Sequence, residues 1–349
     1  MNRRTFLAAS GAAPALIGAP AKSGARKPVM GSGEHTFEVH HDWAQLPAGM
    51  RWGNTHGIVE DSQGQIYVAH TVHADSARKD TIVVFDHKGR YIRSWGDAFV
   101  GGAHGLHLRK EGGQEFLYLV DTGKGRPGKG IDPKHTFLVK MTLRGEEVLR
   151  IGYPYESPAY KSDGSSKFSP TNIAIAPNGD IYLADGYGSY FIQQYTAQGK
   201  FVRSFGGNGK EPGQLASPHG LILDNRTPGN PYLLVADRTN NRLQRFSLDG
   251  KHLGFDSGVN LPCHFHIRND LAVVPDLAAR VSLLDRDNRV ILHLGEDTAG
   301  DWMELRTKER SEFRPGKFVS PHGACFDHQG NIFVAEWVVV GRVTKLRKV

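Results

Sequence analysis

Hydrophobic residues in this chain occur in short runs, and turn-forming Gly, Asn, Asp and Pro residues separate one run from the next. The clearest example is a segment whose four runs lie at 217–224, 232–237, 242–246 and 250–253. Short alternating runs bounded by turn residues are typical of β-strands rather than helices. We therefore expect this segment to form a unit of four strands.

The four-strand unit recurs along the chain. Residues 169–206 repeat the same order of runs, and all copies can be aligned on one anchor position, occupied by His56, His104, Thr171, His219, Cys263 and His322. Successive anchors are 48, 67, 48, 44 and 59 residues apart. The two longer gaps contain insertions, at 123–135 with 153–167 and at 296–317. A four-stranded repeat of roughly 40–50 residues has the size of a propeller blade.

The repeat predicts an all-β fold, a single six-bladed β-propeller formed by residues 35–349. The length of 349 residues alone would suggest two domains, but one propeller uses nearly all of it. The last copy ends at Val349, one strand short of a complete blade. We expect residues 35–43 to supply the missing strand, because closure of the ring removes exposed strand edges.

The N-terminus has the features of an export signal. Arg3 and Arg4 precede a weakly apolar stretch at 7–21, which contains a candidate cleavage site, Ala19-Pro20-Ala21. We therefore assign residues 1–21 to a twin-arginine signal and 22–34 to a flexible segment, and expect a periplasmic or extracellular protein. The apolar stretch is too short, and too interrupted by Gly and Pro, for a stable membrane span.

Charge and cysteine content narrow the choice of partners. The net charge of +7 falls to +5 when the two arginines of the signal are removed. The basic run at 124–129 has no interleaved aromatic residues, so nucleic-acid binding is not expected. In an oxidising compartment the two cysteines, Cys263 and Cys325, could pair or remain as free buried thiols. Cys263, at an anchor position, is also a candidate metal ligand.

Histidine occupies the anchor of every second copy, at His104, His219 and His322, each followed by glycine. Alternate blades of a six-bladed ring lie about 120° apart, so the three imidazoles should converge on the axis. Three imidazoles with one open position are the ligands of catalytic zinc, and they favour zinc over calcium or magnesium. His56 departs from the alternation and is a candidate fourth ligand, donor to a ligand or substrate contact. The alternative is a turn in which histidine only fills the start of a blade.

Two motifs resemble known families. The sequence Ala236-Asp237-Arg238, followed by Asn240-Asn241-Arg242, resembles the NHL repeat. More specifically, residues 169–246, with Ala184-Asp185-Gly186-Tyr187, Ser217-Pro218-His219 and Pro321-His322, resemble the peptidyl-α-hydroxyglycine α-amidating lyase family. The resemblance implies a six-bladed propeller with zinc on His104, His219 and His322 and a structural calcium. It also implies that Tyr187 is the catalytic tyrosine and Arg238 an active-site arginine. The family's carboxylate-binding arginine lies before the first blade, where Arg51 is the nearest candidate.

The implied activity is that of an exported zinc-dependent lyase, which splits the carbinolamide of a peptide or small molecule into an amide and glyoxylate. Gly323 and Ser320 stand where the family has an acid and a methionine, which bears on the calcium site and on the substrate. Tyr187 could instead pack across its turn, and Arg238 could pair with an aspartate between blades. The recurring Asp121, Asp185 and Asp237 are expected to be structural.

Two other functions are compatible with a propeller of this kind. A lactonase-like propeller hydrolase would use calcium held by Glu, Asn and Asp at the axis, and the three histidines argue against that class. A non-catalytic NHL propeller would use one face to bind protein or glycan. Metal content separates these alternatives: zinc indicates the lyase, calcium alone the hydrolase, and no metal the binding protein.

Overall fold

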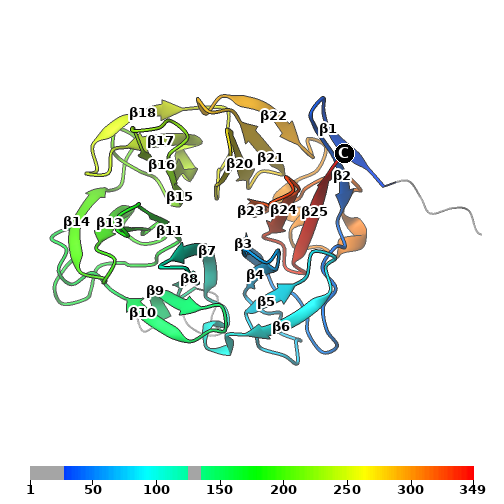
Figure 1. Cartoon of the computed structure of the whole chain (residues 1–349), viewed down its shortest axis with the longest axis horizontal. Helices are drawn as coiled ribbons and strands as arrows, with labels where there is room; N and C mark the ends of the chain where they lie inside the picture. The colour runs from blue at the N-terminus through cyan, green and yellow to red at the C-terminus, as the bar shows by residue number, and fades with distance from the viewer. Residues whose placement is uncertain (1–26, 125–134) are drawn as a thin grey trace, which may run out of the picture.

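The computed structural model describes residues 27–124 and 135–349. The predicted signal at 1–21 and most of the basic run at 124–129 lie outside the described residues. The described chain forms six antiparallel sheets arranged as blades around a central axis (Figure 1). The predicted six-bladed propeller is confirmed.

In each of the first three blades the strands pair in chain order, from the axis outward. Blade one contains β3 (Thr55–Glu60), β4 (Ile66–His70), β5 (Ile82–Phe85) and β6 (Tyr91–Trp95). Blade two contains β7 (Ala103–Glu111), β8 (Gln114–Thr122), β9 (Thr136–Thr142) and β10 (Glu147–Ile151). Blade three contains β11 (Asn172–Ile175), β12 (Ile181–Ala184), β13 (Phe191–Tyr195) and β14 (Phe201–Gly206).

The remaining blades follow the same order, and within residues 27–124 and 135–349 short helices occur only between strands. Blade four contains β15 (Pro218–Asp224), β16 (Tyr232–Asp237), β17 (Arg242–Phe246) and β18 (His252–Asp256). Blade five contains β19 (His266–Arg268), β20 (Leu271–Asp276), β21 (Arg280–Leu284) and β22 (Val290–Leu294). Blade six contains β23 (Pro321–Phe326), β24 (Ile332–Glu336), β25 (Arg342–Lys348), β2 (His35–His40) and β1 (Val29–Ser32). The helical turns are η1 (Asp97–Phe99), η3 (Arg238–Asn240), α1 (Trp302–Leu305) and η4 (Arg310–Glu312).

The ring closes by pairing the two ends of the described chain. Strand β2 pairs antiparallel with β25, with Val39 opposite Leu346, as the missing strand of the last repeat predicted. Strand β1 then adds a fifth strand through a hairpin at Gly33. The assignment of residues 22–34 to a flexible segment is therefore wrong for 29–32. These residues are ordered because they pair with β2 and bury Met30.

Closure of the ring should contribute strongly to stability. Phe37 in β2 is 2% exposed and packs in the cluster that contains Phe318 and Leu346. We expect Phe37→Ala to lower the free energy of unfolding by about 3–5 kcal/mol, measured by urea denaturation. Val29→Ala, at a position 55% exposed, is the control and should change it by less than about 0.5 kcal/mol. If the two variants lose equal amounts of unfolding free energy, packing of β2 does not stabilise the closed ring.

The recurring blade acids are structural, as predicted. Asp185 accepts hydrogen bonds from the Tyr160 hydroxyl at 2.6 Å and the Ser169 amide at 2.7 Å. Asp237 accepts from Arg242 Nε at 2.7 Å. Asp185 thus ties the segment before β11 to the end of β12, and Asp237 links the two ends of the turn between β16 and β17.

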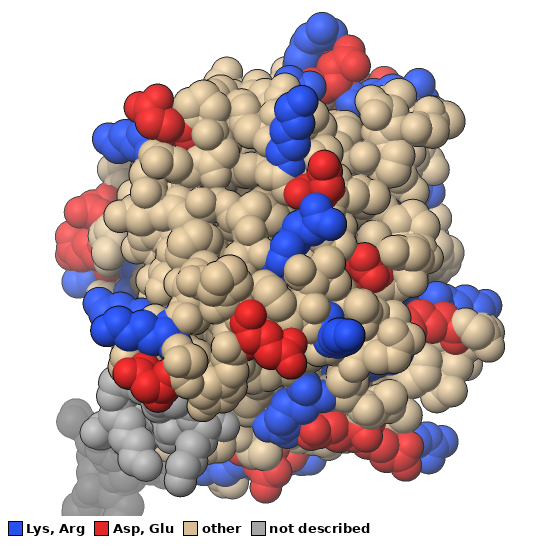
Figure 2. Space-filling model, turned by 90° about the vertical axis from the view of Figure 1, so that its left-hand side faces the viewer, with Lys and Arg blue, Asp and Glu red and all other residues tan. Residues whose placement is uncertain are grey.

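Both cysteines are free and buried, so they do not form a disulfide. The side face in Figure 2 carries Lys and Arg interspersed with Asp and Glu, without a continuous stripe of one sign. Among the described residues, no helix has the length and apolar character that a membrane crossing requires.

Candidate metal centre

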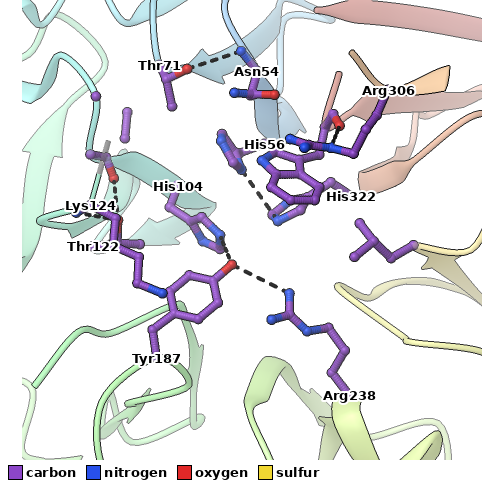
Figure 3. Close-up of a pocket in the computed structure, with 15 residues that line it drawn as sticks. Asn54, His56, Thr71, His104, Thr122, Lys124, Tyr187, Arg238, Arg306 and His322 are labelled. Atoms are coloured by element: carbon purple, nitrogen blue, oxygen red, sulfur yellow. Dashed lines mark hydrogen bonds between the residues drawn. The ribbon is translucent and has the colours of Figure 1, made fainter. Parts of the chain in front are cut away.

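The innermost strands bring the predicted imidazoles together on the axis. His104 of β7, His219 of β15 and His322 of β23 have ring centroids 4.7–4.9 Å apart. His56 of β3 lies equally close, 4.7 Å from His104 and 4.5 Å from His322. The repeat therefore places four imidazoles, rather than three, around one point (Figure 3 shows three of them).

The potential ligand atoms divide into two overlapping groups. In each group the atoms lie within 4.8 Å of one another: His56, His104 and His322 in one, and His219, Cys263 and His322 in the other. The predicted set of His104, His219 and His322 is thus split, and His322 belongs to both groups. The Tyr187 hydroxyl lies between the separated pair, 3.2 Å from His104 Nε2 and 2.9 Å from His219 Nε2.

Backbone carbonyls orient two of the rings. His104 Nδ1 donates to the Thr171 carbonyl oxygen at 2.8 Å, and His219 Nδ1 donates to that of Cys263 at 2.8 Å. A carbonyl oxygen only accepts, so the proton of each neutral ring is on Nδ1 and the lone pair is on Nε2. Metal-binding histidines are commonly fixed in this way.

Burial keeps the imidazoles neutral. It lowers the pKa of His104 to about 3, and the nearby Arg238 and Lys124 act in the same direction. It likewise lowers the pKa of His56, His219 and His322 well below the ordinary value, helped by the neighbouring histidines. Neutral imidazole is the form that binds a metal. The donor set therefore fits zinc or a similar borderline cation.

The surroundings fit calcium less well, because calcium prefers oxygen ligands. A Cβ at Gly323 would lie 2.0 Å from the His56 carbonyl oxygen, so an acid cannot replace this glycine without a backbone shift. Among the described residues that line the adjacent cavity there is no Asp or Glu. The structural calcium implied by the family resemblance thus stays a prediction.

A cavity of about 400 Å³ opens beside the imidazoles (Figure 3). Its described lining contains His56, His104 and His322 but not His219. Three basic side chains also line it, Lys124, Arg238 and Arg306, together with the apolar Leu277 and Trp337. A cavity lined by cations and without carboxylates favours an anionic ligand.

Tyr187 lies in this cavity rather than packing only across its turn. It follows β12, and its amide donates to the Ser169 carbonyl oxygen at 3.1 Å. Lys124 Nζ lies 3.6 Å from the centre of its ring, and Arg238 Nη1 donates to its hydroxyl at 3.5 Å. Burial raises the pKa of Tyr187, whereas Arg238 acts to lower it.

Arg238 begins the helical turn η3 and reaches into the cavity. Its Nη2 donates to Ser217 Oγ at 3.1 Å, and that hydroxyl donates to the Gly186 carbonyl oxygen at 2.9 Å. Arg238 does not form the ion pair with an aspartate between blades that was the alternative. The neighbouring Asp237 pairs with Arg242 instead. Arg238 therefore keeps its charge directed at Tyr187 (Figure 3).

The prediction that Arg51 lies at the site is wrong, because Arg51 does not line this cavity. Its side chain is 54% exposed, pairs with Asp75 at 3.2 Å, and lines a different surface depression beside Trp52 and His73. Its amide is held by Ser76 Oγ at 3.0 Å, which fixes this loop away from the cavity.

Sequence reasoning did not find Arg306 or Trp337. The Arg306 guanidinium lies 3.3 Å from the centre of the Trp337 ring. Trp337 follows Glu336 as Arg238 follows Asp237, so the two residues occupy equivalent positions in the repeat. This equivalence could have predicted that Trp337 lies near the site. Arg306 comes from the insertion at 296–317, which has no counterpart in the repeat.

No protein-family model matches the chain. It is 31% identical over 235 residues to the peptidylglycine α-amidating monooxygenase of Rattus norvegicus, covering 63% of this chain and 23% of the relative. It is 26% identical over 287 residues to peptidyl-α-hydroxyglycine α-amidating lyase 1 of Drosophila melanogaster, covering 74% and 47%. It is 29% identical over 209 residues to NHL repeat-containing protein 3 of Mus musculus, covering 58% and 54%.

The chain is a six-bladed β-propeller that is similar in sequence to proteins named as amidating enzymes and NHL-repeat proteins. It spans about half or less of the length of these curated relatives. Among solved structures, a streptogramin B lyase has a TM-score of 0.56 at 14% identity, covering 89% of this chain and 97% of that one. The gluconolactonase XC5397 of Xanthomonas campestris has a TM-score of 0.57 at 12% identity, covering 94% and 96%. These two likenesses concern the fold alone.

Proposed function

We propose that this protein is an exported metal-dependent lyase, which cleaves the N–C bond of a carbinolamide to give an amide and glyoxylate. The single observation that carries the proposal is the position of the Tyr187 hydroxyl. It lies between the imidazoles of His104 and His219, beside a cavity lined by cationic side chains. The name of one sequence relative, peptidyl-α-hydroxyglycine α-amidating lyase 1, supports the same reaction. Export is proposed from Arg3 and Arg4 and the apolar stretch that follows them.

The cation would be held by His322, which belongs to both groups of potential ligands, together with His219 from one group or His56 and His104 from the other. Neutral buried imidazoles with their Nδ1 protons on carbonyl oxygens fit zinc in particular. Bound there, zinc would supply Lewis-acid chemistry, lowering the pKa of a substrate hydroxyl.

The substrate carboxylate would bind to the basic side chains of the cavity. Guanidinium groups bind carboxylates through paired charge-assisted hydrogen bonds, and Arg306 and Arg238 both line the cavity. Trp337, stacked on Arg306, restricts the guanidinium and excludes water from one side. The carboxylate would thus be fixed while the hydroxyl faces the imidazoles.

The reaction needs one proton to move. In N–CH(OH)–COO⁻ the hydroxyl loses a proton, the C–N bond breaks and its electron pair stays on nitrogen, which takes up a proton. The Tyr187 hydroxyl is placed to carry this proton between the two atoms. Arg238, 3.5 Å from that hydroxyl, stabilises the phenolate during the transfer. Tyr187 therefore acts as a proton shuttle.

The direct test combines metal analysis with a product assay. Protein recovered after export is expected to contain stoichiometric zinc and to release glyoxylate from a peptide that ends in α-hydroxyglycine. Calcium without zinc would instead favour the lactonase-like alternative. Protein that holds no metal and releases no glyoxylate would favour the binding propeller, a role open to NHL-type folds.

Arg306 and Arg51 give a matched pair of variants for substrate binding. We expect Arg306→Ala to raise KM by roughly 10- to 100-fold, because a charge-assisted hydrogen bond contributes about 1.5–3 kcal/mol. Arg51→Ala is the control and should leave KM unchanged, because Arg51 lies outside the cavity. Steady-state glyoxylate release measures both. A raised KM in Arg51→Ala with none in Arg306→Ala would place the carboxylate elsewhere.

A further inference from the structure

Cys263 lies at the centre of the propeller, unlike the other cysteine. It is 0% exposed, and its Sγ and ring nitrogens of His219 and His322 all lie within 4.8 Å of one another. Cys325 is also buried, but it packs in the apolar cluster of Ile58, Phe85 and Phe333. Blade five thus contributes a sulfur at the anchor position where alternate blades contribute an imidazole.

The backbone holds this sulfur in place. Leu261 adopts a left-handed conformation with φ of 54°, and the Cys263 amide donates to the Pro275 carbonyl oxygen at 2.9 Å. Cys263 Sγ donates to the Leu261 carbonyl oxygen at 3.5 Å. The carbonyl oxygen of Cys263 itself accepts from His219 Nδ1. One residue therefore orients an imidazole and presents a thiol beside it.

The charge balance of the site favours a thiolate when a cation is bound. The cavity already contains Lys124, Arg238 and Arg306, and no carboxylate is among its described lining residues. A divalent cation held only by neutral imidazoles would add to this positive charge. Burial raises the pKa of the free Cys263 thiol to about 12, although Arg238 acts to lower it. The thiolate would therefore form only with a cation bound, because a bound cation displaces the proton of a coordinating thiol.

We propose that Cys263 is a thiolate ligand of the axial cation, alongside His219 and His322. The site is then a nitrogen-and-sulfur site that selects zinc, or a cation of similar softness, over calcium and magnesium. This inference shares one requirement with the proposed function, namely that a cation binds on the axis. It adds a ligand that the resemblance to amidating lyases does not imply.

X-ray absorption at the zinc edge tests the proposal on the whole protein. Zinc-loaded wild-type protein is expected to show one sulfur neighbour at about 2.3 Å together with nitrogen neighbours at about 2.0–2.1 Å. In the cobalt-substituted protein, a sulfur-to-cobalt charge-transfer band is expected in the near ultraviolet. Cys263→Ser should lose both signals and bind zinc at least about tenfold more weakly. Cys325→Ser is the matched control, a second buried cysteine outside both ligand groups, and should retain them.

The outcomes separate this inference from the proposed function. A wild-type spectrum with nitrogen and oxygen neighbours alone would overturn the role of Cys263 and leave the lyase proposal standing. Retention of the sulfur signal in Cys263→Ser would also overturn it. Wild-type protein that binds neither zinc nor cobalt would overturn both proposals. The wild-type measurement decides even where the Cys263→Ser variant fails to fold.

Discussion

The His322→Ala variant is expected to lose its zinc and at least about a thousandfold in kcat/KM for glyoxylate release. His322 is the one residue shared by both groups of potential ligands, so its removal weakens every arrangement of the cation. Loss of a Lewis-acid stabilisation of about 4 kcal/mol corresponds to roughly 10³ in rate. Elemental analysis and the glyoxylate assay measure the two effects. In addition, zinc should no longer raise the melting temperature, because that shift requires binding to the folded state.

His264→Ala is the control for this experiment. His264 is buried near the axis, at 4% exposure, but it belongs to neither ligand group. The control should keep its zinc and most of its activity, although a change in stability is expected from the altered packing. Full zinc content in His322→Ala, or equal loss in the control, would show that the cation is not held at the shared position.

The blades could be predicted because the sequence repeats the same local pattern. Four short apolar runs with turn residues occur in five copies and three runs in the sixth, and each anchor lies at or just before the innermost strand of a blade. His104 and His219 could be placed on the axis from this register alone, since position in the repeat determines position in the ring. The closing strand β2 was predictable because the last repeat lacked one.

The detailed arrangement of the site could not be obtained in this way. The repeat gives the angle of an anchor around the axis but not the depth or rotamer of its side chain. Cys263 and His56 are therefore as close to His322 as the predicted ligands are, and His104 is separated from His219 by Tyr187. The exact position of each ring depends on individual contacts with backbone carbonyls, such as that between His104 and Thr171.

Residues outside the repeat were the least predictable. Arg306 lies in an insertion, and only the folded chain places it against Trp337 at the cavity. Arg51 was assigned from its position before the first blade, but its loop is fixed by Ser76 and its charge is paired with Asp75. Insertions and edge loops are not constrained by the symmetry of the ring, so repeat position carries no information about them.

Tyr187→Phe is expected to lower kcat by about 10²- to 10⁴-fold while zinc content and KM change little. This range is typical for loss of a positioned proton-transfer group. The ring would still pack against Lys124, so the change removes only the hydroxyl that lies between His104 and His219. Tyr160→Phe is the matched control, because its buried hydroxyl binds Asp185 outside the cavity. It should reduce stability and leave kcat nearly unchanged. Undiminished turnover in Tyr187→Phe would remove the tyrosine from the chemistry, and the proton would then have to travel by another group.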